Sequence, residues 1–193
     1  MEYIIIALHG WKGNLESMKI IKKAFDFKNT KWLFLQGPYK VNDKEFSWYK
    51  KDNLIGYQCK ASLKLLNKMI SNILKSGFPI NKIYLLGFSQ GACLAMDFIV
   101  KHKLSIGGII PISGFIRQKD KFKRDIANSN TNTPILLIHC HKDMIVPPKE
   151  SHEAYELFME AGFDVKLHLL NGGHKIPLKA KRLIREFIRK SKN

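Results

Sequence analysis

The chain has 193 residues, the usual length of one domain, and 45% of them are hydrophobic, so a disordered chain is excluded. Lys and Arg number 33 against 16 Asp and Glu, which gives a formal net charge of +17 at pH 7. Only five of the basic residues are Arg, the side chain that makes bidentate contacts with bases and phosphates. We therefore expect a lysine-rich surface and no nucleic-acid partner.

The chain shows no signal of a membrane or secreted protein. Its longest uncharged run, 104–116, is interrupted by glycines and a proline and is too short to cross a bilayer. The first residues lack the basic start of a signal peptide. The three cysteines have no metal-like spacing, so we expect free thiols and a cytoplasmic protein.

Short apolar runs alternate with segments of helical period along the chain, as in a parallel sheet covered by helices. The expected strands are 3–8, 32–35, 83–86, 106–112, 135–138 and 165–170. The last run alternates polar and apolar residues, which suits an edge strand. We predict a single α/β domain over 1–193, a three-layer sandwich around a mostly parallel sheet.

Apolar residues spaced by three and four predict the helices. We expect them at 55–76, closed by Gly77, and at 90–102, 150–161 and 178–190. The last helix has an apolar stripe that we expect to dock on the sheet, although it would also suit an anionic membrane surface. The basic residues in or beside this helix, opposed by the single acid Glu186, are Lys175, Lys179, Lys181, Arg182, Arg185, Arg189, Lys190 and Lys192.

The most informative motif is Gly-x-Ser-x-Gly at 87–91, between an expected strand and an expected helix. Glycines on either side of Ser89 permit a very tight turn, which would expose the serine next to helix N-terminal amides. This context is typical of a nucleophilic serine. The alternative is a serine that only caps the helix.

A nucleophilic serine needs a base and a group that orients the base. His174 follows the 165–170 strand, and Asp143 follows the 135–138 strand. Both strand ends lie at the sheet edge where ligands gather, and the order Ser89, Asp143, His174 is that of α/β-hydrolases. The alternatives are a loop histidine and a turn aspartate.

The loop after the first strand is expected to supply an oxyanion donor. We nominate the backbone amides of Trp11 and Gln90 and assign His9 a structural role in that loop. The side chains of Trp11, Trp48, Phe88 and Met144 are candidates for an apolar substrate pocket, with an ordinary core role as the alternative.

His139 and His141 lie on the same face of a strand end, close to Asp143, so metal binding is the competing interpretation. No further ligand occurs at a recognisable spacing, and we favour no metal. Cys93, four residues after Ser89, is expected to be core rather than a nucleophile.

The sequence resembles the phospholipase/carboxylesterase family of α/β-hydrolases. The resemblance rests on Leu8-His9-Gly10, Gly87-Phe88-Ser89-Gln90-Gly91-Ala92, Ser113-Gly114, Asp143-Met144-Ile145-Val146-Pro147 and Gly173-His174, together with the segment 77–83. It implies the α/β-hydrolase fold, hydrolysis of small carboxylic esters or thioesters through Ser89, Asp143 and His174, and no cofactor. Lysophospholipase activity and association of the basic C-terminal helix with an anionic membrane remain alternatives, and the oligomeric state stays open.

Overall fold

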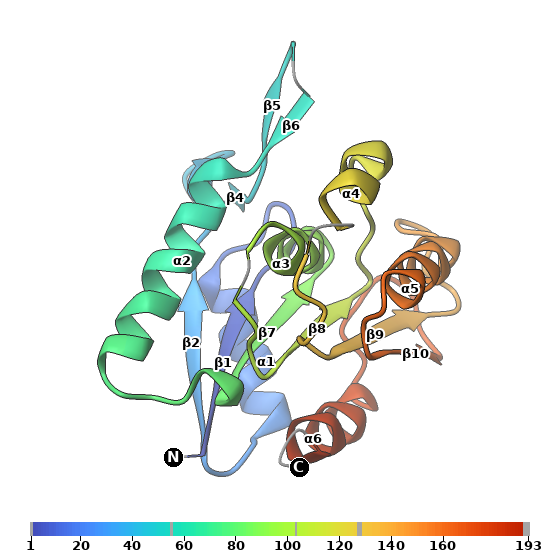
Figure 1. Cartoon of the computed structure of the whole chain (residues 1–193). Helices are drawn as coiled ribbons and strands as arrows, with labels where there is room; N and C mark the ends of the chain where they lie inside the picture. Colours follow the sequence, from blue (N-terminus) through green and yellow to red (C-terminus); the bar gives the residue numbers. More distant parts are fainter. Residues whose placement is uncertain (1, 55, 103, 127–128, 191–193) are drawn as a thin grey trace.

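The computed structural model describes residues 2–54, 56–102, 104–126 and 129–190 (Figure 1). Six strands form one sheet in the order β10-β9-β8-β7-β1-β2, and every neighbouring pair is parallel. Their bounds are β1 (Tyr3–Leu8), β2 (Thr30–Leu35), β7 (Ile83–Phe88), β8 (Gly108–Ile112), β9 (Ile135–Cys140) and β10 (Val165–Leu170).

The expected strands are all present. Strands β1, β8 and β9 are buried throughout because helices cover both faces of the sheet, which explains their continuous apolar runs. The prediction that 165–170 is an edge strand is confirmed, since β10 is half-buried at one end of the sheet. Strand β2 forms the other edge.

Helices lie on both faces of the sheet, which confirms the three-layer α/β architecture (Figure 1). One face packs against α1 and α6, and the opposite face against α2, α3 and α5 with α4 beside them. The helices are α1 (Leu15–Phe25), α2 (Lys60–Lys75), α3 (Gln90–Lys101), α4 (Lys119–Ile126), α5 (Lys149–Glu160) and α6 (Ala180–Lys190).

Several elements differ from the predictions. Residue 55, the expected start of the second helix, lies outside the described residues, and α2 begins only at Lys60. Two short hairpins precede it: β3 (Tyr39–Lys40) with β4 (Phe46–Ser47), and β5 (Lys50–Asp52) with β6 (Gly56–Gln58). Helices α1 and α4, of 11 and 8 residues, were not predicted; each buries two residues.

Helix α6 docks on the sheet as expected, through buried Ala180, Ile184 and Ile188. Its arginines are exposed on the outer side, while Lys192 lies outside the described residues. The apolar stripe is thus occupied by the protein's own core. Within the described ranges, no helix has the length and apolar character needed to cross a bilayer.

Buried His9 anchors the loop after β1, which confirms its predicted structural role. Its Nε2 accepts hydrogen bonds from the amide of Gly37 and the side chain of Gln36, both at 3.0 Å, and its Nδ1 lies 2.7 Å from the carbonyl oxygen of Gly10. Burial lowers the pKa of His9, against a smaller raising effect from the Gly10 carbonyl. The ring is therefore neutral, with its proton on Nδ1.

This arrangement predicts a loss of stability in mild acid. The unfolded chain binds a proton at His9 more readily than the folded chain, so the free energy of unfolding falls as the pH drops below about 6.5. We expect His9→Ala to cost about 1–3 kcal/mol at pH 7.5 and to show a shallower loss between pH 7.5 and 5.5 in denaturant titrations. Replacement of the exposed His152 is the control; equal slopes for His9→Ala and the unmodified chain would contradict the assignment.

Candidate active site

Ser89 lies in the tight turn between β7 and α3, with φ 50° and ψ −114°, a conformation that costs energy for any residue except glycine. Glycines on either side of Ser89 allow the backbone of this turn to pack closely against neighbouring backbone. A Cβ on Gly91 would lie 2.3 Å from the carbonyl oxygen of Leu8, and one on Gly87 would lie 2.3 Å from the carbonyl oxygen of Gly91. Only glycine is accommodated at either position, as the motif predicted.

Asp143 and His174 are brought together from loops 31 residues apart. The Nδ1 of His174 lies 2.8 Å from Oδ2 of buried Asp143, while Oδ1 accepts hydrogen bonds from the amides of Ile145 and Val146 at 3.0 and 2.9 Å. Burial alone would raise the pKa of Asp143, but these three hydrogen bonds outweigh it and hold the pKa below its usual range. The carboxylate is therefore ionised at neutral pH, and His174 carries its proton on Nδ1.

His139 is a third member of this network, a role that its sequence position did not reveal. Its Nε2 donates to the carbonyl of Val146 at 2.8 Å and lies 3.3 Å from Oδ2 of Asp143, and its Nδ1 lies 2.6 Å from the hydroxyl of Ser151. Burial lowers the pKa of His139, so the ring is neutral. Both ring nitrogens have protein partners, which leaves neither for the metal that the competing interpretation required.

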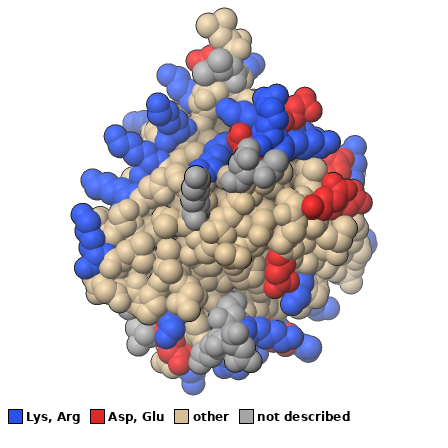
Figure 2. All heavy atoms as spheres, viewed as in Figure 1, with Lys and Arg blue, Asp and Glu red and all other residues tan. Residues whose placement is uncertain are grey.

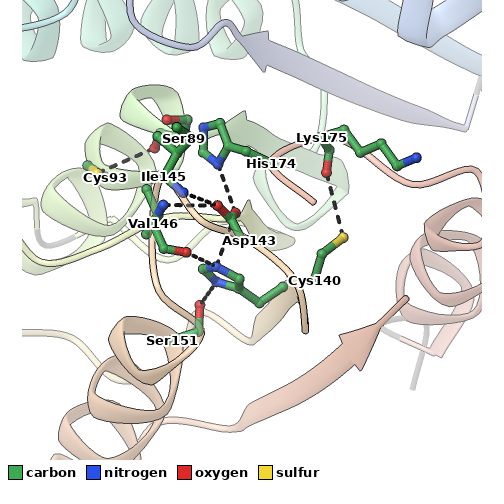
Figure 3. A network of polar contacts seen from close by, with 10 residues as sticks. Ser89, Cys93, Cys140, Asp143, Ile145, Val146, Ser151, His174 and Lys175 are labelled. Atoms are coloured by element: carbon green, nitrogen blue, oxygen red, sulfur yellow. Dashed lines mark hydrogen bonds and ion pairs between the residues drawn. The ribbon is translucent and has the colours of Figure 1, made fainter. Parts of the chain in front are cut away.

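Figure 3 shows the His174 ring between Ser89 and Asp143. No hydrogen bond joins Ser89 to His174 in the described part of the chain, although such contacts are often long before substrate binds. The ring of Phe88 lies against the His174 ring, with 4.9 Å between centroids. The three predicted residues thus share one edge of the sheet, and the Asp143–His174 pair is hydrogen-bonded.

The two nominated oxyanion donors come from two different segments of the chain. Trp11 follows β1 and is 60% exposed, while Gln90 is the buried first residue of α3. Among the hydrogen bonds of the described residues, none is donated by either backbone amide. The Gln90 side chain has a role that the sequence did not reveal: its Oε1 accepts from the amide of Trp48 at 2.7 Å and bonds the hydroxyl of Ser47.

The expectation that Trp48 lines the substrate pocket is wrong. Its side chain is fully buried, and its indole Nε1 donates to the carbonyl of His9 at 2.7 Å. The Trp48 ring also packs against the His9 ring, so Trp48 stabilises the loop after β1. Met144, by contrast, is 89% exposed next to Asp143, and Phe88 is half-buried.

Cys93 lies one turn into α3 and is buried, as are Cys59 and Cys140, and all three are free thiols as predicted. Burial raises the pKa of Cys93 to about 12. The thiol is therefore protonated at neutral pH, in agreement with a core role rather than a nucleophilic one.

Sequence relatives, solved structures and a family model connect this chain to known proteins. Acyl-protein thioesterase 1 of Kluyveromyces lactis is 33% identical over 115 residues, which cover 58% of this chain and 50% of that protein. Acyl-protein thioesterase 1 of Gibberella zeae is 26% identical over 198 residues, covering 94% and 84% of the two chains. For the yeast relatives from Kluyveromyces lactis and Debaryomyces hansenii, the match spans about half of their length.

Solved structures extend the likeness to the whole fold. Arabidopsis thaliana SOBER1 superposes with a TM-score of 0.84 at 21% identity, over 99% of both chains. Esterase PE8 superposes with a TM-score of 0.83 at 22% identity, over 98% of this chain and 92% of that one. The family model described as Phospholipase/Carboxylesterase matches residues 1–192. The chain therefore belongs to the phospholipase/carboxylesterase family of α/β-hydrolases.

Proposed function

We propose that this protein is a serine hydrolase that cleaves carboxylic esters or thioesters of short-to-medium acyl chains. The observation that carries the proposal is the hydrogen-bonded Asp143–His174 pair at the sheet edge where Ser89 occupies its strained turn. Relatives named acyl-protein thioesterase and probable carboxylesterase support the same class of reaction. The substrate is a small molecule or an acyl group presented on a larger one.

The roles of the three side chains follow from their protonation. Asp143 accepts a hydrogen bond from the Nδ1–H of His174, so Nε2 is the free base that removes the proton of the Ser89 hydroxyl. The Ser89 oxygen attacks the carbonyl carbon, and the leaving alcohol or thiol takes that proton from His174. Water, activated by the same ring, then hydrolyses the acyl-enzyme and regenerates Ser89.

The charge that develops on the carbonyl oxygen needs donors already in place. We assign this role to the backbone amides of Trp11 and Gln90, which follow Gly10 and Ser89 where these two segments come close together, and which have no acceptor in the described ranges. Each such donor contributes about 3–4 kcal/mol to transition-state stabilisation in comparable enzymes. The N-terminal end of α3 adds a favourable dipole.

Phe88 and Met144 remain our candidates for contact with the acyl chain, because they lie next to His174 and Asp143. Met144 is 89% exposed, so its side chain is accessible to the acyl chain of a substrate. The apolar stripe of α6 is buried, so only the basic outer face of this helix is free to contact a membrane. We therefore favour hydrolysis over membrane binding as the function.

Ser89→Ala is expected to lower kcat for p-nitrophenyl ester hydrolysis at least about 10³-fold, because the nucleophile is lost. The assay uses esters of two to twelve carbons and an acyl thioester, and thermal unfolding checks that the variant is folded. Ser105→Ala, away from the turn, is the matched control. Retained hydrolysis by a folded Ser89→Ala variant would exclude the proposed nucleophile.

Asp143→Asn tests the orienting carboxylate separately. The asparagine side chain has the shape of the carboxylate but no negative charge to stabilise the imidazolium form of His174. We therefore expect kcat to fall about 10³–10⁴-fold while KM changes little. The exposed Asp120→Asn on α4 serves as the control for loss of one negative charge. A kcat for Asp143→Asn within about tenfold of the unmodified enzyme would contradict the role.

A further inference from the structure

A cavity of about 540 Å³ lies away from the catalytic residues, under the β5–β6 hairpin and between α2, α3 and α4 (Figure 1). None of the three proposed catalytic residues lines it. Residues at its wall that bear on its chemistry are Tyr49, Tyr57, Asp97, Arg117, Lys121 and Phe122. Along α3, the cavity residue Asp97 follows Ser89 by eight positions, or roughly 12 Å at 1.5 Å per residue.

Arg117 is the unusual group in this wall. Its guanidinium lies over the rings of Tyr49, Tyr57 and Phe115, 4.6, 4.5 and 5.0 Å from their centroids. Aromatic faces attract the cation but accept no ordinary hydrogen bond from it. The buried Nε of Arg117 has no hydrogen-bond partner, and no carboxylate pairs with Arg117 in the described part of the chain.

Two acids line the cavity, Asp97 and Asp125, and no ion pair joins either of them to Arg117 among the described residues. Asp97 pairs with Lys101 at 3.2 Å and accepts hydrogen bonds from the Tyr49 hydroxyl at 2.9 Å and the Cys59 thiol at 3.5 Å. Burial, with Asp97 beside it, raises the pKa of Tyr49 well above its usual value, so this hydroxyl keeps its proton and remains a donor to Asp97. Arg117 therefore keeps its hydrogen-bonding capacity for a group from outside.

The rest of the wall combines positive charge with apolar surface. Five basic side chains line the cavity against two acidic ones. Figure 2 shows Lys and Arg gathered over α2 and α4, the helices on either side of the cavity. Between these charges, Leu63, Phe122 and the tyrosine rings supply apolar surface. An anion with an apolar body matches both features.

We infer that this cavity is a second binding site, which holds an amphiphilic organic anion with its carboxylate or phosphate against Arg117. A buried unpaired guanidinium N–H costs free energy that an acceptor oxygen would recover, and bidentate oxygen pairs suit the planar fork. The apolar body of the ligand would lie against Leu63 and Phe122. The site does not depend on the proposed hydrolysis, since the residues that line it take no part in that reaction.

The test is calorimetric titration of the full chain with decanoate, decyl phosphate, decanol and inorganic phosphate. Decanoate or decyl phosphate is expected to bind at least about tenfold more tightly than decanol, and inorganic phosphate more weakly than decyl phosphate. A preference between the two charged probes identifies a free fatty acid or a phosphorylated lipid as the source. Decanol that binds as tightly as both anions would overturn the proposal.

Arg117→Gln is expected to weaken binding of the preferred anion about ten- to hundredfold, and Arg117→Lys by less, because charge remains but the fork is lost. Arg124→Gln is the matched control: it removes the same charge from exposed α4 outside the cavity and is expected to change binding less than about threefold. If the Arg117→Gln and Arg124→Gln variants weakened binding equally, general electrostatic attraction rather than Arg117 would hold the anion. That result would overturn the proposal.

A photoreactive decanoate locates the ligand without any substitution at Arg117. Cross-links in 56–75 or 115–125 would support the cavity, whereas cross-links only around Ser89 or His174 would place the anion at the catalytic edge and refute it. Ser89→Ala, which abolishes the proposed hydrolysis, is expected to leave anion binding within about twofold. Failure of the hydrolysis proposal and failure of this one are therefore distinguishable.

Discussion

The proposed active site depends on one close approach, in which the first turn of α3 packs backbone against backbone on the end of β1. At Gly91 the carbonyl oxygen of Leu8 occupies the space that any side chain would need. This contact holds Ser89 in its strained conformation at the sheet edge and brings the Gln90 amide next to the loop that carries Trp11. A bulkier residue at 91 would move the nucleophile and the oxyanion donors together.

The loops around this turn are fixed by buried hydrogen bonds rather than by regular structure. The Gln90 side chain accepts a hydrogen bond from the amide of Trp48, and the Trp48 indole donates one to the carbonyl of His9. On the other side, His139 binds the carbonyl of Val146 and contacts Asp143, whose carboxylate orients His174. Because buried polar groups are costly to leave unpaired, each of these bonds restricts the loop that carries it.

The strands and most helices were predictable because their signals are local. Continuous apolar runs identified β1, β8 and β9, and spacing of three and four identified α2 and α6. Helices α1 and α4 were missed although their buried pairs, Met18 with Phe25 and Phe122 with Ile126, have helical spacing. The two hairpins gave no local signal because their strands have two or three residues each. Trp48 was misassigned because the sequence does not distinguish an aromatic residue that lines a substrate pocket from one that packs in the core.

The sequence by itself determined the α/β architecture and the positions of Ser89, Asp143 and His174 at strand ends, because parallel strands bring their carboxyl ends to one edge. Only the tertiary structure decided which polar groups meet there: His139 behind Asp143, and the Gln90 side chain under Trp48. It also decided that Arg117 lies among the rings of Tyr49 and Tyr57. Such contacts join distant segments of the chain, and neither periodicity nor spacing along the sequence records them.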